Sequence, residues 1–188
     1  TLAHGVVPSS ASEGTVAVAT LPGVPLPAGI DIWLEMPPSV VPHATKHNNY
    51  YYSFDHWFHL DGSEAGAWVE YKGKTSTGWG SWTWIEPTGG YPHSITNSSL
   101  AVNGASGGAL PVFGGSTYSG WLSEEIDVQN ITNIANFEEL AFRFRVWTSD
   151  ASALRPGWFV DNAVIHNDGS GVGAWHHGCD INGYSYTN

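Results

Sequence analysis

The sequence predicts an all-β protein, a two-sheet antiparallel β-sandwich of the jelly-roll kind with an N-terminal arm or edge strand. Apolar and polar residues alternate with a period of two in the aromatic-rich segments. A helical pattern is confined to about one turn around residues 134–138. Between the segments lie most of the 23 glycines and 11 prolines, as turns between strands require. Short strands with one buried and one solvated face form antiparallel sheets, and two such sheets pack against each other through their buried faces.

The chain divides into three parts by composition. Residues 1–29 are rich in proline and alanine and hold one strand-like stretch, TVAVATL at 15–21, so we expect an arm or an extra edge strand. Residues 30–166 carry the strand patterns of the jelly-roll domain. Residues 167–188 have no core pattern and are expected to be a C-terminal tail or linker.

The clearest strand is the segment NYYYSFDHWFHLD. Its alternation places one set of side chains in the core: Tyr50, Tyr52, Phe54, His56, Phe58 and Leu60. The opposite set faces away: Tyr51, Ser53, Asp55, Trp57, His59 and Asp61. The other expected strands are 30–36, 67–71, 81–86, 121–128, 140–148 and 157–166. Residues 87–120 are expected to form a long loop, because they are rich in Gly, Ser, Asn and Pro.

Composition excludes several classes of protein. Only 12% of the residues are charged, and six basic residues against seventeen acidic ones give a formal net charge of −11. This argues against binding to nucleic acid or to anionic lipid, both of which need clustered Lys and Arg. There is no run of 18 apolar residues, so no membrane insertion is expected. With Cys179 as the one cysteine, no intrachain disulfide can form.

Five motifs follow one another along the chain: HWFHLDGSEAGAWVEYKG, GWGSWTWIEP, PVFGGSTYSGWLSEEIDV, LAFRFRVWTSD and RPGWFVDNAVI. In this order they resemble the MAM-like jelly-roll modules attached to immune-inhibitor-A-type secreted metallopeptidases and to large microbial surface proteins. The resemblance covers roughly residues 45–166, and GWFVDNAVI is its most specific piece. It implies an extracellular or cell-surface sandwich without catalytic activity, often with a structural calcium ion. The family usually has a second acid where this chain has Asn162.

Four carboxylates are the candidate calcium ligands, since hard cations prefer several oxygen ligands. They are Asp61, Glu64, Glu70 and Asp161, which lie near expected strand ends. In the last strand, alternation puts Asp161 on the face of Phe159, Ala163 and Ile165, at the margin of the core. A carboxylate there needs a partner, either a cation or an arginine such as Arg143 or Arg145.

Tryptophans are the candidate ligand-binding residues, because the apolar face of a sugar ring packs flat on an indole. Trp79, Trp82 and Trp84 lie in one short stretch, and Trp33, Trp57 and Trp68 fall on expected solvent faces. The alternative is that these indoles fill the core.

Self-association is a further expectation. Tyr51, Trp57 and Trp147 would form aromatic, charge-poor patches on a monomer, and such patches mark contact surfaces. The arm could add a strand to a neighbouring subunit and build a homopolymeric filament, or it could close its own sheet.

HExxH is missing, and the sequence shows no GxSxG nucleophile elbow with the strand-to-helix context that such an elbow needs, so we expect a non-enzyme. Asn97 and Asn130 stand in N-glycosylation sequons, which fits an exported protein. The sequence therefore favours an extracellular structural or adhesive module that forms a surface filament by strand exchange. The alternatives are a carbohydrate-binding module and an accessory domain of a secreted metallopeptidase.

Overall fold

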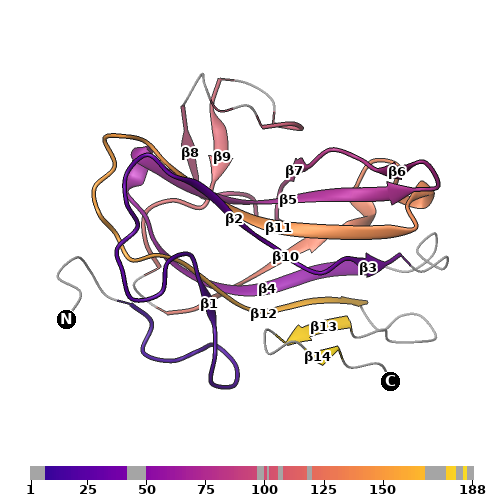
Figure 1. The fold of residues 1–188 in the computed structure, drawn as a ribbon, viewed down its shortest axis with the longest axis horizontal. Helices are drawn as coiled ribbons and strands as arrows, with labels where there is room; N and C mark the ends of the chain where they lie inside the picture. The colour runs from indigo at the N-terminus through magenta and orange to yellow at the C-terminus, as the bar shows by residue number, and fades with distance from the viewer. Residues whose placement is uncertain are drawn as a thin grey trace.

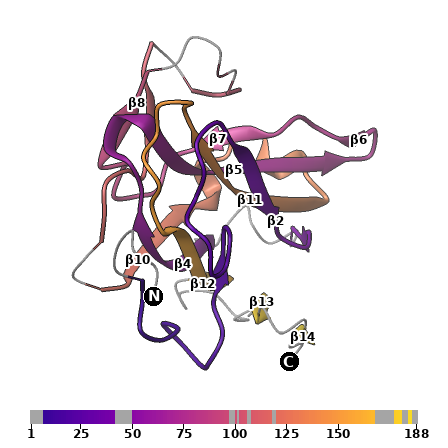
Figure 2. The same ribbon diagram turned by 60° about the vertical axis from the view of Figure 1, so that its left-hand side comes forward.

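The computed structural model describes residues 7–41, 50–96, 100, 102–105, 108–117 and 120–167, and the backbone of two short strands at 177–180 and 184–185. It confirms the predicted all-β sandwich, with two antiparallel layers facing each other (Figures 1 and 2). The strands are β1 (Val18–Ala19), β2 (Asp31–Glu35), β3 (Ser39–Val40), β4 (Tyr50–His59), β5 (Ala65–Thr75), β6 (Gly78–Trp79), β7 (Thr83–Ile85), β8 (His93–Ile95), β9 (Leu110–Val112), β10 (Leu122–Asp127), β11 (Glu139–Thr148), β12 (Gly157–Asn167), β13 (His177–Asp180) and β14 (Tyr184–Ser185). Short 3₁₀ turns are η2 (Gly62–Glu64), η3 (Val128–Asn130) and η4 (Ile134–Asn136).

The sheets have the strand order of a jelly roll. Sheet I joins its strands in the order β10-β4-β12-β1, and sheet II joins them in the order β7-β5-β11-β2. All of these neighbours pair antiparallel. Along the chain these strands alternate between the two sheets, except that β7 follows β5 in sheet II. Shorter strands extend the edges: β3 pairs with β11, β6 with β5, and β13 with both β12 and β14.

Strand alternation fills the space between the sheets. The six side chains predicted to point inward from residues 50–60 are all buried. Tyr52 of β4 stacks on Phe142 of β11, with ring centroids 4.0 Å apart, and Phe54 meets Phe144 edge to face at 5.0 Å. Aromatic side chains thus supply most of the contact between the two layers.

The prediction that Trp57 faces solvent is wrong. Its indole is buried, with Phe159 edge-on at 5.5 Å between ring centroids and His59 beside it. The arm runs along this outer face of sheet I, where Ser12 bonds to both Asp55 and Asp161. A third covering layer therefore buries a face that alternation alone assigns to solvent.

A β-bulge corrects the predicted face of Asp161. The register between β12 and β4 shifts between Asp161 and Val164, and Asn162 adopts a left-handed conformation with φ 48°. Because the extra residue reverses the alternation, Ala163 joins the core while Asp161 lies opposite Asp55 on the outer face. Asn tolerates this backbone conformation better than most residues do.

The predicted loop at 87–120 contains a hairpin that covers part of sheet II. Strands β8 and β9 pair with each other and bring Ile95, Leu110 and Val112 against Trp68 in a second core cluster. Figure 1 shows this hairpin standing above β5. Trp68 is consequently fully buried, which corrects its predicted position on a solvent face.

The N-terminal arm closes its own sandwich. Val18 and Ala19 pair with Val160 and Phe159 of β12, and Leu26 forms a β-bridge with Arg155. In the described part of the chain, none of the helices has the length and apolar character that a membrane span needs.

Candidate functional site

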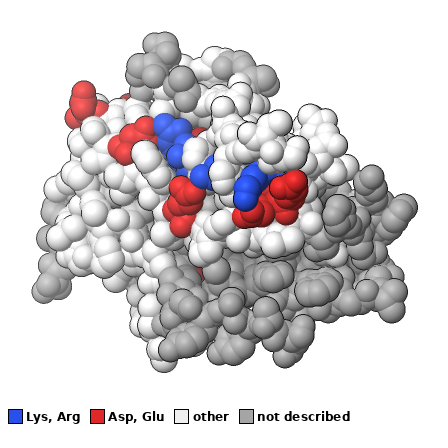
Figure 3. Space-filling model, turned by 45° about the vertical axis from the view of Figure 1, so that its right-hand side comes forward, with Lys and Arg blue, Asp and Glu red and all other residues white. Residues whose placement is uncertain are grey.

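The outer face of sheet II carries a row of alternating indoles and cations. Four of the six basic residues of the chain, Lys72, Lys74, Arg143 and Arg145, lie here on β5 and β11. Figure 3 shows basic side chains gathered on this face and flanked by acidic ones. The row exists because alternate residues of neighbouring strands point to the same side of a sheet.

The cations of this row stack on tryptophan rings. The Lys72 ammonium lies 4.3 Å from the centroid of Trp82 and 5.1 Å from that of Trp79. The Arg143 guanidinium carbon lies 4.5 Å from the centroid of Trp82 and 4.9 Å from that of Trp33. Such contacts stabilise the cations and hold the indole planes in place.

Each cation of the row also has a carboxylate partner. Arg145 binds Asp31 through two nitrogens at 2.6 and 2.8 Å, and this hydrogen-bonded pairing raises the pKa of Arg145. Lys72 pairs with Glu35 at 2.6 Å, and Lys74 pairs with Glu139. The basic side chains of this face are therefore paired with carboxylates. This agrees with the low content of Lys and Arg, which argued against a basic surface for nucleic acid or anionic lipid.

Glu70, a predicted calcium ligand, is the anchor of this row. Its buried carboxylate accepts from Arg143 Nε, from Arg145 Nη1 at 3.0 Å and from Trp68 Nε1 at 3.0 Å. Two guanidinium groups and an indole N–H thus compensate the desolvation of this carboxylate.

The structure does not bring the other predicted calcium ligands together with Glu70. Asp61 accepts from the Ala153 N–H at 2.5 Å and lies 3.6 Å from Arg155, and Glu64 accepts from the Ser149 hydroxyl. Asp161 belongs to the opposite sheet. Among the described residues, no group of three or more His, Cys, Asp or Glu could hold a metal ion.

The three predicted ligand-binding tryptophans have different environments. Trp79 is 41% exposed. Trp82 is half-buried under the Lys72 and Arg143 cations. Trp84 packs against the second core, and its indole N–H donates to the Pro111 carbonyl at 3.2 Å. Trp33 is 54% exposed at the edge strand β2. Trp147, predicted to lie in an exposed patch, is half-buried against the second core.

An uncharged pocket of about 300 Å³ adjoins Trp79. Strands β5, β6 and β7 form it together with Asn103 and with Phe137, the residue after the turn η4. No charged residue lines it: its walls are Tyr71, Gly73, Thr75, Thr77, Gly78, Trp79, Gly80, Ser81, Thr83, Asn103 and Phe137. The Asn103 amide N–H₂ donates to Thr83 Oγ1 at 3.0 Å and to the Trp82 carbonyl at 3.4 Å. Its Oδ1 is left to accept a hydrogen bond from a ligand hydroxyl.

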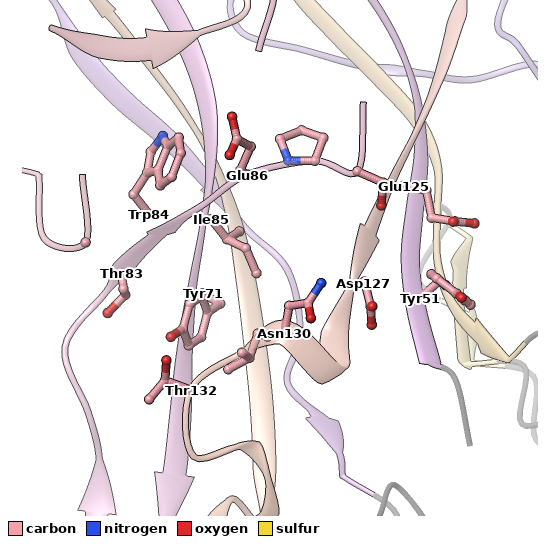
Figure 4. A pocket seen from close by; sticks show the side chains of 14 residues that line it. Tyr51, Tyr71, Thr83, Trp84, Ile85, Glu86, Glu125, Asp127, Asn130 and Thr132 are labelled. Atoms are coloured by element: carbon pink, nitrogen blue, oxygen red, sulfur yellow. The ribbon is translucent and has the colours of Figure 1, made fainter. Parts of the chain in front are cut away.

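A larger cleft of about 650 Å³ lies beside this pocket, and Tyr71 and Thr83 line both. Figure 4 shows its walls: Tyr71, Thr83 and Ile85 on one side, Asp127 and Glu125 of β10 on the other. The cleft opens at the edge of the sandwich where β7 of sheet II and β10 of sheet I have no further neighbour among the described strands.

The two predicted glycosylation sites have different outcomes. Asn97 lies outside the described residues. Asn130 is exposed and lines the 650 Å³ cleft, so a glycan attached there would stand at the mouth of the cleft.

Sequence reasoning missed both hollows. The Trp79 pocket depends on Phe137, the residue after η4, coming within reach of β5, a contact between residues that are far apart in the chain. A local signal did exist, because the segment TSTGWGSWT surrounds its indoles with hydroxyl-bearing residues and glycines.

In comparisons with known proteins, no protein-family model matches this chain, and no curated protein matches its sequence.

Proposed function

We propose that this chain is a non-catalytic, exported jelly-roll module that adheres to glycans through the pocket beside Trp79. The observation that carries the proposal is a partly exposed indole beside an uncharged pocket lined with hydroxyl and amide groups. The indole offers its face to the C–H side of a sugar ring, and the polar groups offer hydrogen bonds to its hydroxyls.

Three hydroxyl side chains and one amide support the polar part of this site. Thr75 and Thr77 hydroxyls bond to each other at 2.8 Å, and Thr83 donates to the Ser81 carbonyl at 3.3 Å. These contacts fix the hydroxyl positions, while each oxygen keeps a lone pair for a ligand. No charged side chain lines the pocket itself, so hydrogen bonds and contact with the indole would hold the ring there.

A glycan array probed with the full chain, followed by calorimetry on the best ligand, tests the proposal. We expect Trp79→Ala and Asn103→Ala to weaken binding at least tenfold. Trp33→Ala is the matched control, since Trp33 is an exposed indole of the same sheet that does not line the pocket. Failure of every glycan to bind, or equal affinity of Trp79→Ala and the parent chain, would overturn the proposal.

The proposal that the chain does not cleave the glycan it binds is tested separately. The bound glycan is incubated with the chain and analysed by mass spectrometry for shortened products. We expect the glycan to stay intact, and a product that is formed by the chain would show an enzyme instead.

A second candidate function is assembly into a filament through the arm. The observation that favours it is the weak attachment of β1, which pairs with β12 through two residues only. Beside it lies an apolar groove of about 170 Å³, whose lining includes Ile32, Leu34, Phe144 and Val160. Another subunit's arm could replace β1 there. A cysteine pair at Val18 and Val160 tests this: a disulfide that links two subunits supports assembly, and one confined to a single subunit contradicts it.

A further inference from the structure

The pocket beside Trp79 borders a second hollow of different chemistry. Tyr71 and Thr83 form the boundary, because both line the 300 Å³ pocket and the 650 Å³ cleft. A ligand longer than one sugar ring that leaves the pocket over this boundary enters the cleft. The chemistry of the cleft therefore restricts the identity of the ligand.

The cleft is acidic and lacks cations. Glu86, Glu125 and Asp127 line it, and none of its lining residues is Lys, Arg or His. Asp127 uses one oxygen to accept the Gln129 N–H at 2.9 Å, and His166 Nε2 lies 3.8 Å from Glu125. By contrast, each carboxylate in the row on sheet II is matched by a basic residue.

The three carboxylates of the cleft are spread along its walls. Figure 4 shows Glu86 on the side of β7 and, across the cleft, Glu125 and Asp127, which are two residues apart on β10. They do not form a group that could hold one metal ion. Carboxylates that are distributed in this way suit a ligand that carries several positive charges along a chain.

We propose that the glycan bound by this module is an amino-sugar oligosaccharide with free amino groups. One ring stacks at Trp79 in the uncharged pocket, and the chain passes Tyr71 and Thr83 so that its ammonium groups face the carboxylates of the cleft. The inference rests on the proposed function and names the ligand class. The hydroxyls of Thr83 and Thr132 supply further hydrogen-bonding groups along this path.

Three physical consequences follow. Ammonium groups are attracted to the carboxylates of the cleft, whereas acetylated amino groups carry no charge and are not. Ion pairs in an open cleft are partly screened, so each should contribute about twofold to fivefold in affinity. Affinity should also fall as the salt concentration rises, because the Debye length shortens.

Calorimetry with two oligosaccharides of equal length tests the inference: a glucosamine oligomer and its fully N-acetylated counterpart. We expect the full chain to bind the glucosamine oligomer at least fivefold more tightly at low salt, with the difference shrinking in 0.5 M salt. Glu86→Gln and Glu125→Gln should each remove about twofold to fivefold of the affinity for the glucosamine oligomer and leave binding of the acetylated one unchanged. Glu13→Gln is the matched control, because it changes net charge equally and Glu13 is an exposed residue that lines neither the cleft nor the pocket.

The outcomes separate this inference from the proposed function. Equal affinity for both oligomers, or equal effects of Glu86→Gln and Glu13→Gln, overturns the inference. Binding of neutral glycans that depends on Trp79 would still support the proposed function. Binding of the glucosamine oligomer that is insensitive to Trp79→Ala also overturns the inference, since the ligand would then not span both hollows. If no glycan binds, both the inference and the proposed function are contradicted. Thermal unfolding of each variant shows that it is folded.

Discussion

At the scale of single residues, the core contains a histidine held in its neutral form. His56 is fully buried, and its Nδ1 accepts the indole N–H of Trp158 at 3.1 Å. Because an indole nitrogen can only donate, the proton of His56 must be on Nε2. Within the described part of the chain that nitrogen has no hydrogen-bond partner, and the nearest carboxylate oxygen of Glu124 is 3.8 Å away.

This histidine should make the fold sensitive to acid. Burial lowers the pKa of His56 from 6.5 to about 3, although Asp55 acts in the opposite direction. The unfolded chain therefore binds a proton more readily than the folded one, and stability falls as the pH drops from about 6.5 toward 3. The full shift corresponds to at most about 5 kcal/mol. Glu124, whose pKa is raised by burial, opposes this trend at low pH.

Replacing the histidine tests this prediction. His56→Asn keeps an acceptor within reach of the Trp158 indole but cannot titrate. Denaturant unfolding followed by tryptophan fluorescence at pH 7, 5.5 and 4.5 should show a smaller loss of stability for the variant than for the parent chain. Parallel curves for the two proteins would assign the acid sensitivity to other groups.

At the scale of elements, close approach between segments shapes the Trp79 pocket. Gly73 of β5 lies so near the Phe137 ring that a Cβ atom there would overlap it. The turn η4 could not reach β5 over any larger residue. Glycine inside a strand is unfavourable by itself, and here it marks the place where another segment comes close.

Gly73→Ala should therefore destabilise the fold by about 1–3 kcal/mol, as overpacking does. Gly80→Ala is a matched control in the same pocket, because its nearest neighbour would lie at an ordinary contact distance of 3.5 Å. The denaturant concentration at the midpoint of unfolding, measured with an unchanged m-value, compares the stabilities of the two variants. If Gly73→Ala is as stable as Gly80→Ala, the contact with Phe137 does not constrain the turn.

The start of the arm binds a buried carboxylate on the bulge of β12. Asp161 accepts the backbone N–H groups of Ser12 at 2.9 Å, Glu13 at 3.0 Å and Asn162 at 2.8 Å. These donors stabilise a charge that lies directly opposite Asp55, where like charges otherwise repel.

Asp161→Ala should detach the start of the arm. We expect thermolysin to cleave residues 7–24 at least tenfold faster in this variant, and stability to fall by about 1–3 kcal/mol. Glu138→Ala, at an exposed carboxylate outside this contact, is the control. Equal cleavage rates in the two variants would mean that other contacts hold the arm.

At the scale of the whole molecule, the predicted calcium ligands serve as structural contacts. Asp61, Glu64, Glu70 and Asp161 each accept hydrogen bonds from protein donors on separate parts of the sandwich. From this geometry we predict that millimolar calcium leaves the melting temperature unchanged relative to chelator. A rise of several degrees with calcium would show that the ion reorganises these contacts, as the family resemblance implies.

Much of the architecture was predictable from local pattern. Alternation in residues 50–60 identified the inner face of β4, and the same pattern located β2, β10, β11 and β12. It failed for Trp57 and Trp68, which a third layer buries. It also failed for Asp161, because a bulge reverses alternation and strand periodicity carries no signal for where a bulge falls.

Taken alone, the sequence determined the all-β class, the strand-forming segments, the acidic surface and the indoles around residue 79. These properties follow from composition and from a period of two, which act over a few residues. Only the tertiary structure decided which charges pair, which tryptophans stay exposed and where the cleft opens. Those outcomes depend on contacts between distant segments, such as Gly73 with Phe137 and Ser12 with Asp161, and local pattern does not encode them.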